Sequence, residues 1–157
     1  MLQVRNMCVC TPVRRLEGIT YWVIEDPEEI YDFINEEIRK EWEEDAKSEG
    51  REPQEDPWLR TLAEREWSSE VIEIERVKLN PKIMNYVDSE RGYSFSESLA
   101  KRSNELEECI KRYAAVIWSV IVRNDDYMLV DGYCRYTALR TMNIRKIYAY
   151  IGTLHTK

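Results

Sequence analysis

The chain has 157 residues, of which 43% are hydrophobic and 34% are charged, and its formal net charge is -7. This length and composition are typical of one soluble globular domain with a real core, and the negative charge excludes a uniformly basic, nonspecific nucleic-acid binder. The sequence shows no apolar run as long as a membrane span and no signal-peptide core, so we expect a cytoplasmic protein that does not contact a membrane.

The first part of the chain predicts two strands, at residues 4–12 and 19–24, because both runs are rich in β-forming residues. The polar segment 14–18 between them is long enough for a hairpin connection. Cys8 and Cys10 fall on the first strand. We expect these two cysteines, and Cys109 on a later helix, to be small buried hydrophobes rather than zinc ligands, since the chain has no Cys-x-x-Cys pair and a single histidine.

Two acidic helices are predicted next, at residues 26–50 and 56–68. Each begins with an aspartate in the capping position followed by a proline in the first helical turn, and each carries an apolar stripe at helical spacing. Stripes of this kind usually face a core. The five tryptophans of the chain also leave open the alternative that these acidic helices bind a protein partner.

The last third of the chain carries the clearest pattern. A β-branched run at residues 116–122 and a second apolar run at 127–130 predict two strands joined by a short turn. The sequence Asp-Gly-Tyr-Cys-Arg follows at residues 131–135. The apolar spacing then becomes helical as far as Asn143, and residues 147–151 alternate like a strand. A strand is therefore predicted to run into a glycine that opens a helix.

This junction predicts a phosphate-binding site. The first turn of a helix leaves backbone N–H groups unpaired, Gly132 would let an anion approach them closely, and Arg135 could hold a phosphate through two parallel hydrogen bonds. The charge distribution favours an anionic ligand, because residues 109–157 carry 8 Lys and Arg against 3 acids, whereas the first 108 residues carry 15 against 27. The simpler alternative is a turn glycine beside an arginine that makes a surface ion pair.

Five motifs follow one another in the second half of the chain. They are Asn80-Pro81 at the end of a predicted strand, Leu106-Glu107-Glu108-Cys109-Ile110-Lys111 on a helix, the strand residues 119–122, the Gly-x-x-Arg-x-x-Ala sequence at 132–138, and the strand at 147–151. This series resembles the ParB/sulfiredoxin superfamily. The resemblance implies a single α+β domain with a mixed sheet flanked by helices, in which residues 70–157 form the core and residues 1–69 add an N-terminal hairpin and the two acidic helices.

In ParB-like proteins the Gly-x-x-Arg turn holds nucleotide phosphates. The resemblance therefore implies that Gly132, Tyr133, Cys134 and Arg135 bind the phosphates of a nucleotide, with ATP and CTP as candidates, or of a nucleic acid. We expect this binding to serve a metal-dependent nuclease or nucleotide hydrolase. The alternative is a non-catalytic module that binds a nucleotide or a DNA backbone and uses the acidic helices for a protein partner.

Candidate catalytic groups lie in the turn and in a long polar segment before it. Asp131 and Arg135 of the turn, together with Glu90 of the polar segment, are expected to be catalytic, because such loops commonly supply general bases beside a phosphate site. Asp131 and Asp88 are expected to hold Mg²⁺ or Mn²⁺, which prefer carboxylate oxygens. The simpler role for Asp131 is that of a turn and cap residue.

The chain also departs from the resembled family at this turn. Sulfiredoxins carry Gly-Gly-Cys-His-Arg, so Tyr133 stands where their reactive cysteine lies, and Cys134 is directly beside Arg135. Sulfiredoxin-like thiol chemistry at Cys134 is a further alternative, and it requires the helix N-terminus and Arg135 to lower the pKa of this thiol. Partition-type ParB proteins have a further Glu-Asn-x-x-Arg motif and a helix-turn-helix, and neither is found up to Lys157.

Overall fold

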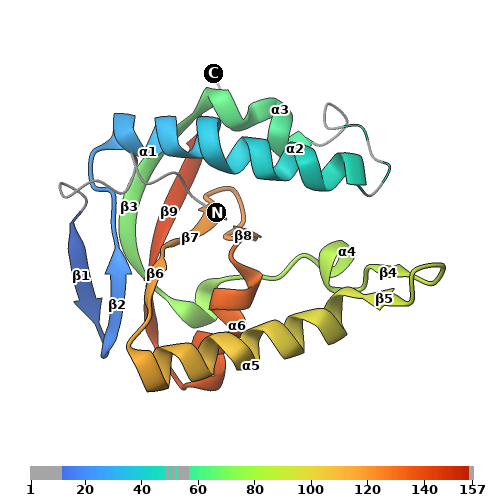
Figure 1. Ribbon diagram of the computed structural model, residues 1–157. Coiled ribbons are helices and arrows are strands. Elements are labelled where there is room, and N and C mark those ends of the chain that lie inside the picture. Colours follow the sequence, from blue (N-terminus) through green and yellow to red (C-terminus); the bar gives the residue numbers. More distant parts are fainter. Residues whose placement is uncertain (1–11, 49, 51, 53–56, 156–157) are drawn as a thin grey trace.

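The computed structural model describes residues 12–48, 50, 52 and 57–155. Its elements, in chain order (Figure 1), are β1 (Val13–Leu16), β2 (Ile19–Trp22), α1 (Pro27–Phe33), the π-helical turn η2 (Ile34–Ile38), α2 (Arg39–Ser48), α3 (Pro57–Thr61), the 3-10 turn η4 (Leu62–Glu64), β3 (Arg65–Glu73), the 3-10 turn η5 (Ile74–Arg76), α4 (Pro81–Met84), β4 (Val87–Asp88), β5 (Tyr93–Ser94), α5 (Phe95–Tyr113), β6 (Val116–Trp118), β7 (Val120–Arg123), β8 (Leu129–Asp131), α6 (Tyr133–Thr141) and β9 (Lys146–Leu154). Within these ranges, no helix combines the length and the apolar composition needed to span a bilayer.

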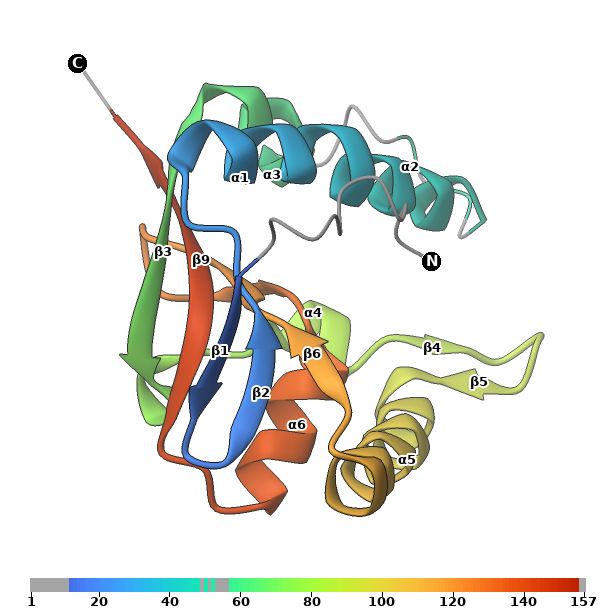
Figure 2. The ribbon, with the colours of Figure 1, turned by 60° about the vertical axis from the view of Figure 1, so that its left-hand side comes forward.

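Two sheets form the centre of the described part of the molecule. One has the strand order β1-β2-β6 and the other β3-β9-β7-β8, and each contains one parallel pair, β2 with β6 and β7 with β9. The short β4 and β5 form a separate hairpin. Helices α1, α2 and α3 lie on one side of the sheets, and α5 and α6 lie on the other (Figures 1 and 2). The predicted α+β fold, with a mixed sheet, flanking helices and an acidic helical insertion, is confirmed.

The four-stranded sheet divides the core because neighbouring residues of a strand face opposite ways. In β7, Val120 and Val122 pack with residues of α5 and α6, whereas Ile121 packs with the N-terminal helices, namely α1, η2 and α2. Tyr150 of β9 lies on the same side as Ile121. The N-terminal helices, together with Leu59 of α3 and Leu62 of η4, therefore cover this face of the sheet, and their apolar stripe is a core face.

The first acidic helix follows its sequence signals closely. The Asp26 carboxylate accepts a hydrogen bond from the Glu29 N–H (3.1 Å), and Pro27 occupies the first turn. The helix continues through η2 into α2, and its buried side chains are Ile30, Phe33, Ile34, Ile38 and Ala46. The π-helical turn is not predicted by the sequence pattern, and such turns are frequent at functional sites.

The first hairpin differs from the prediction. Strands β1 and β2 pair antiparallel, so most of the segment 14–18, expected to be a connection, belongs to β1. Glu17 and Gly18 alone make the turn, with φ of 50° and 82°, the positive values that a two-residue hairpin turn requires. The predicted strand at residues 4–12, except for its last residue, lies outside the described residues together with Cys8 and Cys10. Cys109 is exposed on α5, so its predicted burial is wrong.

The second predicted helix, at residues 56–68, is too long. Helix α3 and the turn η4 end at Glu64, and β3 begins at Arg65. All nine residues of β3 pair with β9, and Trp67, which falls on the predicted helical stripe, is buried on the sheet. Helix propensity is a weak preference that tertiary pairing overrides, and here the ladder with β9 decides the structure.

The predicted strand at residues 116–122 is divided at Ser119. Strand β6 pairs with β2, whereas β7 pairs with β8 and β9, so the chain passes from one sheet to the other at this residue. The predicted hairpin, helix and closing strand that follow are confirmed as β7–β8, α6 and β9, and Asn143 ends the helix with φ of 60°. The segment 80–98, expected to be irregular, contains α4, the β4–β5 hairpin and the start of α5.

Candidate functional site

Gly132 connects β8 to α6 within the turn of residues 131–135, which we name the glycine turn. It caps α6 with φ of 103°, a conformation that suits glycine. An added Cβ would lie 2.8 Å from Arg135 Nη2 and 2.9 Å from Val120 Cγ1. The predicted junction of strand, glycine and helix is confirmed, and the missing side chain makes room for the arginine.

Arg135 folds back over this glycine toward the break between β6 and β7. Its Nη1 donates hydrogen bonds to the carbonyl oxygens of Trp118 and Ser119, both at 3.2 Å. Its Nη2 donates to Asp131 Oδ2 at 3.0 Å, and the arginine side chain is 20% exposed. A phosphate that binds this guanidinium must therefore share it with the Asp131 carboxylate or displace that carboxylate.

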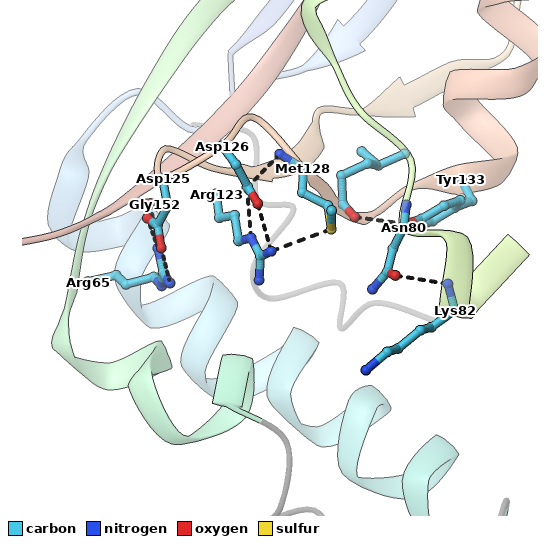
Figure 3. A network of polar contacts seen from close by, with 10 residues as sticks. Arg65, Asn80, Lys82, Arg123, Asp125, Asp126, Met128, Tyr133 and Gly152 are labelled. Atoms are coloured by element: carbon cyan, nitrogen blue, oxygen red, sulfur yellow. Dashed lines mark hydrogen bonds and ion pairs between the residues drawn. The ribbon is translucent and has the colours of Figure 1, made fainter.

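Tyr133 brings two of the sequence motifs together (Figure 3). Its hydroxyl accepts a hydrogen bond from the Asn80 N–H (3.1 Å) and donates one to the Leu129 carbonyl (2.9 Å). Burial raises the pKa of Tyr133, so the hydroxyl stays protonated and able to donate. Asn80 in turn caps α4 by accepting from the Lys82 N–H (3.0 Å). The side chain of Tyr133 thus holds the Asn80-Pro81 motif beside the glycine turn.

The hairpin that leads into β8 is fixed by paired charges (Figure 3). Arg123 donates from Nε and Nη2 to the two carboxylate oxygens of Asp126, at 2.9 and 2.8 Å, and this pairing lowers the pKa of Asp126. The buried Arg65 donates to the Gly152 carbonyl at 2.9 Å and to Asp125 at 3.1 Å. These charges hold the strands that position the glycine turn.

A cavity of about 200 Å³ lies between the glycine turn and the N-terminal helices. Its lining combines apolar and charged side chains: Phe33, Ile38, Glu41, Trp118, Ser119, Ile121, Asp131 and Arg135. Trp42 of α2 also reaches the turn, because its Nε1 donates to Asp131 Oδ1 at 3.4 Å. The N-terminal helices are therefore part of the site and not a separate addition.

Sequence reasoning does not identify Glu41 and Trp42 as site residues. Trp42 falls on the apolar stripe of the predicted helix, which indicates burial but not the partner. Glu41 is one of many acids on that helix. The only sequence feature that indicates a place at the site is its position next to Trp42. Both side chains reach the site because the helices pack on the sheet. A local sequence pattern does not predict this packing.

The other predicted carboxylates lie elsewhere. Asp88 of β4 accepts a hydrogen bond from the Arg91 N–H (3.3 Å) and forms an ion pair with the same arginine (3.4 Å). Glu90 lies exposed in the turn of the β4–β5 hairpin, which projects away from the sheets in both views (Figures 1 and 2). Neither residue lines the cavity beside Asp131. Among the described residues, no three His, Cys, Asp or Glu side chains gather as a metal site.

Cys134 does not have the environment of a reactive thiol. It is partly buried and packs against the core on the α6 side of the sheet. This burial raises the pKa of Cys134, and the nearby positive charges of Arg102 and Arg135 do not offset it. The expectation of a lowered pKa at the helix N-terminus is therefore wrong, because desolvation of the thiolate outweighs the local charges.

Glu41→Gln is expected to stabilise the protein at neutral pH. Burial and the neighbouring Asp131 raise the pKa of Glu41, so the charged form is disfavoured in the folded state. The gain should stay below about 1 kcal/mol, since solvent screens this partly exposed group. It should shrink as the pH falls through the folded-state pKa and vanish below the unfolded-state pKa, where the carboxyl is neutral in both states.

Denaturant unfolding at several pH values measures this effect. The control is Glu44→Gln, which removes the same charge from a position of α2 that does not line the cavity. A loss of stability at neutral pH in Glu41→Gln, or a gain that does not change with pH, would show that the cavity does not penalise this carboxylate.

Comparison with known proteins gives a limited result. No protein-family model and no curated protein matches the chain. Part of its fold is similar to a ParB N-domain. Two structures of pNOB8-like ParB N-domains match with a TM-score of 0.40 each, at 17% and 18% sequence identity, over 56% and 57% of this chain. The matched parts are 30% and 28% of those chains. A similarity this low carries no argument about function.

Proposed function

We propose that this protein binds a phosphate-bearing ligand, a nucleotide or a nucleic-acid backbone, at the glycine turn. The observation that carries the proposal is the opening of α6 by Gly132, which has no side chain to bond the first N–H groups of this nine-residue helix. Helix N-termini of this kind receive anions through those N–H groups and the helix dipole. Arg135, in the first turn of the same helix, adds a guanidinium.

The adjoining cavity is partly open to solvent, and its volume sets how much of a ligand it can enclose. At about 200 Å³ it is somewhat larger than the cavity of about 150 Å³ that accepts benzene, and smaller than the roughly 300 Å³ at which pockets for whole drug-sized ligands begin. A phosphate group and its nearest substituent fit, and the rest of a nucleotide or nucleic acid would lie outside. Phosphate binding would replace Asp131 as the partner of Arg135 Nη2, while Asp131 keeps the hydrogen bond from Trp42 Nε1.

Cleavage of the bound phosphoester is a second candidate function. It is favoured by Asp131, whose carboxylate lies beside the guanidinium that would hold the phosphate and could accept a proton from an attacking water. The residues present do not fit a metal centre made by the protein alone. The Asp131 oxygens accept from Arg135 and Trp42, and Asp88 belongs to the projecting hairpin. We therefore propose no step through Mg²⁺ or Mn²⁺.

Arg135→Ala is expected to weaken phosphate binding by at least about tenfold, because a charge-assisted hydrogen bond is lost. Titrations with ATP, CTP, single-stranded DNA and double-stranded DNA, each with and without Mg²⁺ or Mn²⁺, measure the affinity and any product. Arg140→Ala is the matched control, since it removes the same charge from an exposed position near the end of α6. DNA affinity should also fall steeply with salt.

Arg135 also supports the fold, so a folding control is needed. Arg135→Lys keeps the charge and should retain more stability than Arg135→Ala. It should lose the bidentate contact that a guanidinium can make with a phosphate. Unchanged ligand affinity in a folded Arg135→Ala protein would refute the phosphate site. Binding that is lost in the variant without any product in the wild type would favour a binding module over a hydrolase.

A further inference from the structure

Three apolar side chains form a row across the three-stranded sheet, whose strands β1, β2 and β6 lie side by side in Figure 2. The strand register places Val13 opposite Trp22 and Trp22 opposite Trp118. Residues directly opposite each other point to the same face of a sheet, and the two indole rings are 5.6 Å apart between centroids. We name Val13, Trp22 and Trp118 the tryptophan row.

The tryptophan row is open to solvent. Tyr21 and Ile117, which precede the two tryptophans in the chain, point to the other face and are buried. Trp22 and Trp118 are partly exposed, and Val13 is 51% exposed. Within the described part of the chain, neither indole N–H has a hydrogen-bond partner, and neither nitrogen is closed off from solvent. Large rings with available N–H donors at a surface are typical of a protein interface.

The two indole rings form a notch and not a flat platform. Their planes are tilted by 45°. Phe33 of α1 stacks on Trp118 with centroids 5.0 Å apart, so one face of this indole is already covered. A flat ligand such as a nucleobase therefore finds no pair of parallel ring faces to stack between. A notch between aromatic rings suits the ridge of a proline ring, because proline-rich peptides dock in aromatic-lined grooves.

We propose that the tryptophan row binds a proline-rich segment of a partner protein in the polyproline II conformation. Neighbouring strands lie about 4.8 Å apart, so a row across three strands is roughly 10 Å long. One turn of polyproline II has three residues and is about 9 Å long, which matches the row. The carbonyl oxygens of this conformation make no internal hydrogen bonds, so they can accept from the indole N–H groups of Trp22 and Trp118.

The charge beside the tryptophan row favours a basic segment. Helix α1 packs against Trp118 through Phe33, and Glu29 lies one helical turn from Phe33 on the same side of the helix. Three exposed acids lie on α1, namely Glu28, Glu29 and Asp32, and the helix has no lysine or arginine. A segment with arginine beside its prolines therefore complements this rim better than an acidic one.

Three labelled peptides of equal length test the proposal on the full chain. The first has three Pro-Pro-Leu repeats followed by two arginines, the second has alanine for every proline, and the third has two glutamates for the arginines. Fluorescence anisotropy should detect binding of the first peptide. We expect the alanine peptide to bind at least about tenfold more weakly and the glutamate peptide at least about threefold more weakly.

Variants of the tryptophan row locate the peptide. Trp22→Leu should weaken the first peptide by at least about tenfold, and Val13→Ser by at least about twofold. Tyr113→Leu, which removes an exposed ring at the end of α5, is the control and should leave the affinity unchanged. Val13→Ser alters an exposed position, so it keeps the test decisive if thermal melts show that Trp22→Leu is poorly folded.

Four results would overturn this proposal. They are the absence of binding of the first peptide, equal binding of the alanine peptide, equal or tighter binding of the glutamate peptide, and an unchanged affinity in the folded variants of the tryptophan row. The inference is independent of the phosphate site, so saturating ATP should not displace the first peptide. Displacement by ATP would also overturn the proposal, because the peptide would then occupy the cavity at the glycine turn.

Discussion

Gly152→Ala is expected to lower the free energy of unfolding by about 2–3 kcal/mol, a large fraction of the stability of a small domain. Gly152 lies opposite Trp67 in the β3–β9 pair, and an added Cβ would lie 2.6 Å from the buried indole ring. The backbone cannot move aside easily, because the Gly152 carbonyl accepts from the Asn124 N–H (3.0 Å) and from Arg65 Nη1 (2.9 Å). Chemical denaturation of both proteins measures the difference.

A double-mutant cycle separates this clash from other causes. Trp67→Leu alone should destabilise the protein by leaving a cavity. Combined with Gly152→Ala it should cost less than the sum of the two single changes, because the smaller side chain makes room for the new Cβ. Strictly additive costs would show that the indole ring is not the obstacle, and a neutral Gly152→Ala would contradict the packing of β3 against β9.

Gly132→Ala is expected to cost about 2–4 kcal/mol and to weaken phosphate binding as well. An L-residue at φ of 103° is strained, and the new Cβ would meet Arg135 Nη2 at 2.8 Å and Val120 Cγ1 at 2.9 Å. Val120 is buried in the core, so the guanidinium is the group that must move, and it would lose its bonds to the β6–β7 break. Urea unfolding and the titrations used for Arg135→Ala measure both effects.

Gly92→Ala is the matched control for Gly132→Ala. Gly92 also has a positive φ, 62°, but nothing lies within 4 Å of its added Cβ, so the variant isolates the conformational cost of about 1 kcal/mol. A cost for Gly132→Ala no larger than that of Gly92→Ala would mean that Arg135 moves aside without loss. The arrangement of the guanidinium over the glycine would then have no role in stability.

The parts of the fold that depend on local chemistry are predictable from the sequence. The cap at Asp26, the glycine that opens α6 and the stop at Asn143 each require particular residues at adjacent positions. The division of one apolar run at Ser119 and the placement of Trp67 in a strand are different. Both depend on which distant strand pairs with the segment, β2 or β9, and local periodicity contains no such information.

The site shows the same division between local and tertiary causes. The sequence predicts Gly132 and Arg135 together, but it does not indicate that Arg135 turns back to the carbonyls of the β6–β7 break. The sequence predicts a lowered pKa for Cys134 from the charges near it in the chain. Its pKa is raised instead, because the fold buries the thiol, and burial cannot be read from the neighbouring residues. Glu41 enters the cavity only when the N-terminal helices pack on the sheet.

The crossing of the chain at Ser119 also affects how the molecule folds. One uninterrupted run of residues belongs to both sheets, and no flexible linker separates β6 from β7. Arg135 Nη1 holds the carbonyl oxygens on either side of the crossing, so opening one sheet disturbs the other. We therefore expect the two sheets to unfold as one cooperative unit, with the arginine of the glycine turn at the junction between them.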